Sequence, residues 1–266
     1  MEDQPNHDLF ACYYAVAFID LLGQREAMRG LNRSLRRVLD ATVKPRQSFP
    51  EPIKEVLDQM TAWELKHKRL SDGFVVFSSL ARRDRFCPVV GVGSMLLACA
   101  SLMLMSLAKG KPIHGGIDVG VGMKLYPGEL YGPAVAKAYK LESSVAQYPR
   151  IVVGNSLRDY LVQGAQKAEE GIVDSFWKKS AESSLSFLGE DTDGHLIVDY
   201  LGEGVKAVFR DTIDEEILGR VEEFVWKQRE TDRKAKNPKL VTRYLLLTEY
   251  LSSRSLLWFG QGDTEA

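Results

Sequence analysis

Hydrophobic and polar positions alternate or recur in the first half of the chain in a way that predicts both strands and helices. Tyr13–Ile19 is an apolar run typical of a buried strand; it ends at Asp20, and a polar segment with helical spacing follows to about Ala41. After a proline-rich break, Ile53–Lys66 repeats apolar residues at helical spacing. We therefore predict a strand followed by two helices.

The next segment combines a hairpin signal with a long apolar stretch. Within Lys68–Leu80, Asp72 and Gly73 separate two short apolar runs, and Asp-Gly in this setting favours a β-hairpin. Pro88–Ala108 carries no charge and has about the length needed to cross a bilayer. Because glycine and serine interrupt it and no second such span accompanies it, we expect a buried core helix; a membrane anchor is the alternative.

Two further patterns complete this unit. Ile113–Gly122 alternates as a strand, a turn follows at Pro127, a helix is predicted from Pro133 to about Gln147, and Arg150–Val153 is a short strand. The order of elements predicts an α+β fold of the ferredoxin-like type, with a central, mostly antiparallel sheet and helices packed on it.

Beyond Gly154 the pattern changes to charged helices. Asp214–Arg229 and Lys239–Ser252 have helical spacing, and His195–Tyr200 is a single strand-like run. We therefore expect a core domain at residues 9–153 and a helical C-terminal extension at residues 154–266 that completes the fold.

Composition narrows the choice of partners and compartment. Lys and Arg number 35 against 36 Asp and Glu, so the net charge of −1 gives no general attraction for nucleic acid or an acidic membrane. The three cysteines show no metal spacing, and residues 1–8 are polar, unlike a signal peptide. We expect a cytoplasmic protein that contacts neither nucleic acid nor membrane.

Asp20 and Asp72 are the chemically suggestive positions, because each lies at a strand end or a hairpin tip. Neighbouring central strands would bring both carboxylates to one edge of the sheet, where they can hold two hard cations such as Mg²⁺ or Mn²⁺. The plainer alternative is a helix cap for Asp20 and a simple turn residue for Asp72.

Four motifs resemble those of class III adenylate and guanylate cyclases, in the family's order. Phe18–Gly23 (FIDLLG) and Leu70–Phe77 (LSDGFVVF) resemble the two metal motifs. Ile113–Gly120 (IHGGIDVG) resembles the glycine-rich strand, and Tyr131–Glu142 (YGPAVAKAYKLE) resembles the catalytic helix. The resemblance implies a nucleotide cyclase, active as a homodimer whose composite sites take metal groups from one subunit and helix groups from the other.

The amino-acid sequences of these motifs are similar to those of the bacterial Pycsar antiphage cyclases. Two further segments share this similarity: Tyr148–Val153 (YPRIVV) and Val241–Ser252 (VTRYLLLTEYLS). This resemblance implies a pyrimidine nucleoside triphosphate substrate, UTP or CTP, and of the two we favour UTP. The cyclic product would serve as an alarm signal that a separate effector protein detects. The C-terminal extension would then also contribute to the dimer.

The family resemblance assigns roles position by position. It implies that the carboxylates of Asp20 and Asp72 and the carbonyl of Leu21 hold two divalent cations, Mn²⁺ or Mg²⁺, and that Lys140 acts in catalysis. The implied substrate-binding positions are Phe18, Leu22, Gly23, Gln24, Lys68, His114, Glu129 and Ala136.

Several of these positions depart from the family pattern. His114 falls where relatives often have arginine, Ala136 replaces the ribose-binding asparagine, and Lys140 replaces the transition-state arginine. A lysine can neutralise phosphate charge only as a point charge, without the guanidinium fork. Lys68 and Glu129 match the base-reading positions of purine cyclases, and read literally they favour adenine. An adenylate or cytidylate cyclase and a degenerate nucleotide-binding regulatory module therefore remain alternatives, and Lys140 can also be read as a plain surface lysine.

Overall fold

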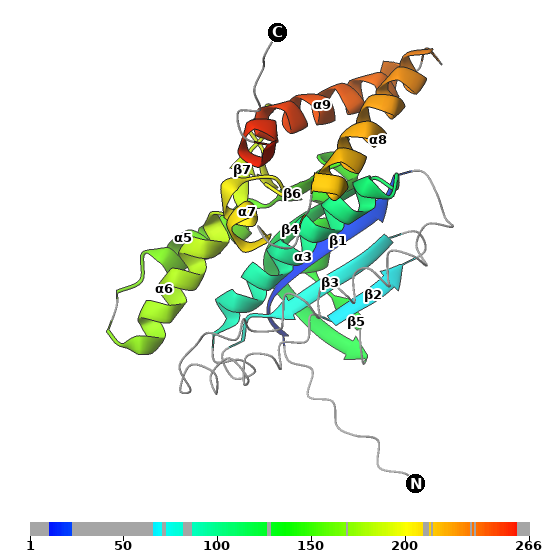
Figure 1. The fold of residues 1–266 in the computed structure, drawn as a ribbon. Coiled ribbons are helices and arrows are strands. Elements are labelled where there is room, and N and C mark those ends of the chain that lie inside the picture. Colours follow the sequence, from blue (N-terminus) through cyan, green and yellow to red (C-terminus); the bar gives the residue numbers. More distant parts are fainter. Residues whose placement is uncertain are drawn as a thin grey trace.

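The computed structural model describes residues 11–22, 66–70, 73–81, 87–126, 129–168, 170–209, 213, 215–234, 236 and 238–259. An eight-stranded sheet lies at its centre (Figure 1). Its strands are β1 (Ala11–Leu21), β2 (Lys66–Leu70), β3 (Gly73–Ser79), β4 (Ile113–Tyr126), β5 (Glu129–Tyr131), β6 (Ile151–Val153), β7 (Leu188–Glu190) and β8 (Leu196–Val198). The helices are α3 (Pro88–Ala108), α4 (Pro133–Ser144), α5 (Asn155–Ala165), α6 (Ile172–Leu185), α7 (Glu203–Phe209), α8 (Glu215–Lys234) and α9 (Pro238–Phe259).

The strand order is β2-β3-β1-β4-β6-β8-β7, with β5 paired to β4. Both β3 and β4 run antiparallel to β1, which lies between them, so β3, α3 and β4 form a split β-α-β unit. Among the described strands only β4 and β6 pair in parallel. The predicted α+β class, with a mostly antiparallel sheet and helices packed on it, is confirmed.

Helix α3 is the apolar segment that has the length of a membrane span. Pro88 occupies its first turn, where a missing N–H leaves no hydrogen bond unmade. The helix packs on one face of the sheet and contacts α6 and α8, and most of its residues are buried (Figure 1). Burial inside the molecule thus explains its uniform hydrophobicity, as the core-helix prediction requires.

Helix α4 covers part of the opposite face of the sheet. Ala134 and Ala138 on α4 pack with Tyr14, Val16 and Phe77, which point to this face from β1 and β3. The backbone of α4 can approach β4 closely only where the strand carries a glycine beneath the helix. A Cβ atom on Gly116 of β4 would lie 2.4 Å from the carbonyl oxygen of Ala138.

The residues after Gly154 share the sheet and the core with those before it. Strand β8 pairs with β6, β7 pairs with β8, and α6 and α8 both contact α3. The expected runs Asp214–Arg229, Lys239–Ser252 and His195–Tyr200 correspond to α8, α9 and β8.

Some predicted boundaries differ from the structure, and some lie outside it. Strand β4 continues to Tyr126 because its end pairs with β5, and α4 ends at Ser144 rather than near Gln147. The two helices predicted between β1 and Lys66 fall outside the described residues.

Candidate functional site

Asp20 lies near the end of β1, between the two strands that flank it. It is directly opposite His114 of β4 on one side and Gly73 of β3 on the other. Directly opposed residues of antiparallel strands point to the same face of a sheet. Asp20 and His114 therefore share the face that α4 covers. One carboxylate oxygen of Asp20 accepts a hydrogen bond from the N–H of Leu21, 2.8 Å away.

Gly73 leaves the β3 side of this carboxylate open. A Cβ atom there would lie 2.8 Å from the Ile19 carbonyl oxygen and 3.4 Å from Oδ1 of Asp20. Asp72, the predicted metal partner of Asp20, directly precedes Gly73 in the sequence and lies outside the described residues. The meeting of the two aspartates remains a prediction.

His114 is held by the segment that follows α4. Its Nδ1 lies 2.7 Å from the carbonyl oxygen of Ala146, and its Nε2 lies 3.2 Å from a carboxylate oxygen of Glu142. Burial lowers the pKa of the His114 imidazole, the Ala146 hydrogen bond and the charge of Asp20 raise it, and Arg243 lowers it; the balance is a lowered pKa.

Glu142 also belongs to this cluster, and no role was predicted for it from the sequence. It continues the buried stripe of α4, one turn after Ala138 and two turns after Ala134. A carboxylate on an otherwise apolar stripe was the available signal, because buried acids are rarely left without a partner. Asp20, His114 and Glu142 each offer a ligand atom, and these atoms lie within 4.8 Å of one another.

A surface cavity of about 360 Å³ opens on the same face, between α4 and β3. Three predicted substrate-binding residues line it: Phe18, Glu129 and Ala136. The rings of Phe18 and Tyr139 meet edge to face with centroids 5.2 Å apart, and the Tyr131 hydroxyl donates a hydrogen bond to Glu129. The structure thus gathers residues from β1, β5 and α4 around one largely apolar hollow.

The remaining predicted residues are more dispersed. Ala136 and Lys140 lie one turn apart on α4 and are exposed to solvent. Leu21 is buried, and the N–H of Leu22 bonds to the carbonyl oxygen of Pro112. The backbone of Lys68 belongs to β2, whereas Gly23 and Gln24 lie outside the described residues.

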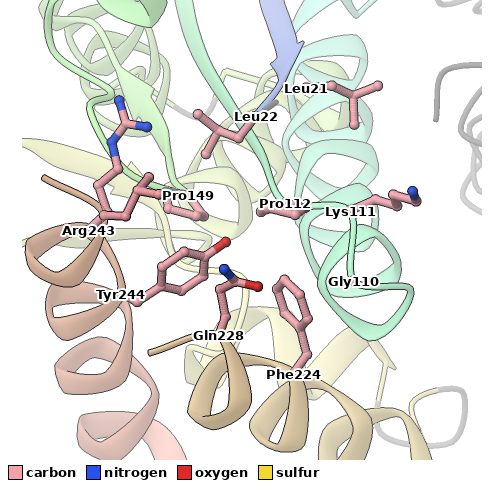
Figure 2. Close-up of a pocket in the computed structure, with 11 residues that line it drawn as sticks. Leu21, Leu22, Gly110, Lys111, Pro112, Pro149, Phe224, Gln228, Arg243 and Tyr244 are labelled. Carbon is pink, nitrogen blue, oxygen red and sulfur yellow. The ribbon is translucent and has the colours of Figure 1, made fainter. Parts of the chain in front are cut away.

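A second cavity of about 270 Å³ lies at the end of β1 (Figure 2). Leu21 and Leu22 line it together with Gln228 of α8 and Tyr244 of α9. Figure 2 shows the Tyr244 hydroxyl and the Gln228 amide directed toward its centre, while the guanidinium of Arg243 extends away. Sequence reasoning missed this cavity because it exists only where α8 and α9 fold back on the end of β1.

No protein-family model matches the chain, and no curated protein sequence matches it. One similar solved structure is that of a class III adenylyl cyclase-like ATP-binding protein from Pseudomonas aeruginosa, with 16% identity and a TM-score of 0.34. The match covers 86% of this chain and 45% of that one, so the chain spans less than half of that protein's length.

Proposed function

We propose that this chain is a class III-type nucleotide cyclase that converts a pyrimidine nucleoside triphosphate, UTP before CTP, into the 3′,5′-cyclic monophosphate and diphosphate. The main support is the position of Asp20. It lies at the end of a central strand, beside a strand that begins at Gly73, and on the face that carries the cavity lined by Phe18, Glu129 and Ala136. The motifs that carry the resemblance to Pycsar cyclases support the pyrimidine substrate.

The residues present fit a divalent cation, because carboxylate and carbonyl oxygens are the ligands that Mg²⁺ and Mn²⁺ prefer. Asp20, Asp72 and the carbonyl of Leu21 would hold the ions. When bound, the two cations would lower the pKa of the ribose 3′-hydroxyl and neutralise charge on the triphosphate. Backbone N–H groups of Leu22, Gly23 and Gln24 would donate to the phosphates.

The cavity between α4 and β3 is the proposed site for the nucleoside. Its walls are mainly apolar, and Phe18 and Tyr139 offer aromatic surface against which a base can pack. Glu129, at its edge, can accept a hydrogen bond from N3–H of uracil, from the exocyclic amino group of cytosine or from a ribose hydroxyl. Because the side chain of Ala136 is small, it leaves open a part of the cavity that a longer side chain would fill.

Lys140 would act on a second copy of the chain. It is exposed on α4, whereas Asp20 belongs to β1 of the sheet, so a lysine presented to a partner subunit suits a composite site. There it would neutralise the charge that develops on the α-phosphate. In this proposal the homodimer works in the cytoplasm, and its cyclic product activates a separate antiphage effector.

The test is to incubate the protein with Mn²⁺ and each of UTP, CTP, ATP and GTP, and to identify the product by mass spectrometry. We expect cyclic UMP, and a loss of at least about 100-fold in rate for Asp20→Ala, since metal stabilisation of charge is worth several kcal/mol. Dominant cyclic AMP would contradict the pyrimidine assignment.

The second candidate is a regulatory module that binds nucleotide without cyclising it. The exposed Ala136 and Lys140, in place of the family's asparagine and arginine, favour it. A metal-dependent rise of the melting temperature with nucleotide, but no cyclic product from any triphosphate, would select this candidate over the enzyme.

A further inference from the structure

We propose that Asp20, His114 and Glu142 together bind one transition-metal cation, which ties the end of α4 to β1 and β4. This site uses one residue of the proposed cyclase centre, Asp20, but neither Asp72 nor a nucleotide. The inference does not depend on cyclase activity.

The hydrogen bond at Nδ1 of His114 determines the protonation of Nε2 in the neutral ring. A carbonyl oxygen only accepts, so the 2.7 Å contact with Ala146 places a proton on Nδ1. In a neutral ring Nε2 then carries a lone pair, and this lone pair faces a Glu142 oxygen at 3.2 Å. Two electron-rich atoms at this distance repel one another unless a proton or a metal cation lies between them.

Metal-binding histidines have a typical arrangement of their second nitrogen. They usually donate the other ring N–H to a carboxylate or a backbone carbonyl, which fixes the tautomer and the ring orientation. The contact between His114 and Ala146 has this form. It leaves Nε2 directed toward the two carboxylates of the cluster.

The distances suit a single ion. Two ligand atoms that are each about 2.1 Å from one cation lie roughly 3–4 Å apart, depending on the angle between them. The 3.2 Å between His114 and Glu142 is in this range, and all three ligand atoms lie within 4.8 Å of one another. The Asp20 side chain is partly exposed, so a rotation of it would bring its oxygen to the same ion, and water can complete the coordination.

Charge also favours a divalent cation over a proton. Glu142 is only 5% exposed and lies close to a second carboxylate, that of Asp20. Two neighbouring carboxylates repel one another. The charge of Arg243 also reaches this cluster, and a divalent cation held directly by the three residues would reduce the repulsion between the carboxylates further.

The ligand types select the metal. One imidazole nitrogen with two carboxylate oxygens suits Zn²⁺, Co²⁺ or Mn²⁺, whereas Mg²⁺ prefers oxygen ligands alone. Because α4 also carries Lys140, two residues before Glu142, an ion here would hold the proposed catalytic helix in place. At a concentration of about 100 times Kd, the ion should raise the melting temperature by roughly 5 °C.

The experiment is a titration with Co²⁺ in the absence of nucleotide, followed by visible absorption and by displacement with Zn²⁺. It uses the wild type and Asp72→Asn, so that the two-aspartate centre does not contribute in the second chain. We expect each to bind one Co²⁺ through His114 with similar affinity; any further Co²⁺ that only the wild type binds belongs to the two-aspartate centre. His114→Ala and Glu142→Gln should weaken binding at least about 10-fold, since these variants remove a direct ligand.

His195→Ala is the matched control, because His195 is exposed and lies outside the cluster. Circular dichroism checks that every variant is folded. Equal Co²⁺ affinity in wild type and His114→Ala would overturn the proposal. So would ¹⁵N NMR that shows His114 protonated on both nitrogens and unchanged by Zn²⁺, because the contact with Glu142 would then be a simple ion pair.

Failure here is distinguishable from failure of the proposed function. A protein that forms a cyclic nucleotide but binds no Co²⁺ through His114 contradicts only the metal inference. A protein that binds Co²⁺ through His114 but cyclises no triphosphate contradicts only the cyclase.

Discussion

Asp118 is a buried carboxylate that serves the fold. It points from β4 toward the start of α5, where Oδ1 accepts a hydrogen bond from the N–H of Leu157 at 2.8 Å. Gly154 gives it room, since a Cβ atom there would lie 2.2 Å from Cγ of Asp118. Burial raises the pKa of the Asp118 carboxyl, although backbone hydrogen bonds and Lys137 lower it in part. The Asp118 carboxylate therefore caps the start of α5, while burial of its charge opposes the stability of the fold.

Asp118→Asn should therefore change how stability depends on pH. Because the folded pKa lies above the unfolded one, the stability that Asp118 contributes is complete below the unfolded pKa and is lost as pH rises through the folded pKa. Asparagine keeps an acceptor oxygen and does not ionise. We expect the variant to gain stability relative to wild type as pH rises from acidic to neutral. Urea unfolding at a series of pH values measures this.

Glu182→Gln is the control for this prediction, because Glu182 is exposed on α6. The free energy of unfolding of Glu182→Gln, relative to wild type, should not rise in this way between acidic and neutral pH. A constant difference between Asp118→Asn and wild type at all pH values would show that the charge of Asp118 is not penalised in the folded protein.

At the scale of elements, the contact between α4 and the sheet decides the geometry of the site. It brings Glu142 to His114, and it places the cavity beside Phe18. Gly116 makes this contact possible, because the helix backbone occupies the space of a side chain at that position. The glycine-rich strand predicted from the sequence is therefore the surface on which α4 packs.

Gly116→Ala should separate the two elements. Its added Cβ would lie 2.4 Å from the Ala138 carbonyl oxygen and 2.4 Å from Cβ of Leu141. We expect the free energy of unfolding to fall by about 1–3 kcal/mol, the usual cost of overpacking. Nucleotide turnover should fall with it, since α4 carries the proposed catalytic group.

Gly219→Ala makes the same chemical change in α8, where nothing lies within 4 Å of the added Cβ. Alanine should there raise the free energy of unfolding by about 0.5–1 kcal/mol, because it is the better helix residue. Denaturant unfolding compares the two variants. Equal stability of both would mean that α4 does not pack on Gly116 as described.

At the scale of the whole molecule, polar contacts add to the shared apolar core in joining parts that are distant in sequence. Arg150, at the start of β6, binds Asp191 and Asp193 in the segment between β7 and β8. Asp199, just after β8, accepts hydrogen bonds from Tyr250 and Arg254 of α9. The Arg150 contacts tie the segment between β7 and β8 to β6, and the Asp199 contacts tie α9 to the end of β8. The outer surface of α4 with Lys140 remains exposed.

If that surface meets a second copy, two inactive chains should restore activity when mixed. An Asp20→Ala chain can still supply Lys140, and a Lys140→Ala chain can still supply Asp20. Random pairing makes half of the dimers mixed, each with one intact site of two, so we expect about a quarter of wild-type activity. The assay is cyclic nucleotide formation after co-refolding or subunit exchange.

An inactive mixture, with both variants folded and the wild type active, would rule out this composite site. Activity of the Lys140→Ala chain by itself would instead show that Lys140 is a plain surface residue.

The sequence by itself determined the elements that have a strong local pattern. The apolar run Tyr13–Ile19, the alternation in Ile113–Gly122 and the uniform hydrophobicity of Pro88–Ala108 each depend on neighbouring residues, and the structure contains the corresponding β1, β4 and α3. The hairpin expected around Asp72 corresponds to the antiparallel pair of β2 and β3, and Asp72 itself lies outside the described residues. These elements also imply the α+β class, because a sheet with one apolar face and apolar helices can bury their apolar surfaces in only a few layered arrangements.

Only the tertiary structure decided what lies next to Asp20. Glu142 reaches His114 because Gly116 admits α4, and the cavity at Leu22 exists because α8 and α9 return to the end of β1. Neither contact has a local pattern, since each joins residues far apart in the chain whose meeting depends on strand order and helix packing. Local hydrophobic spacing specifies elements, whereas the neighbours of a side chain follow from how those elements pack.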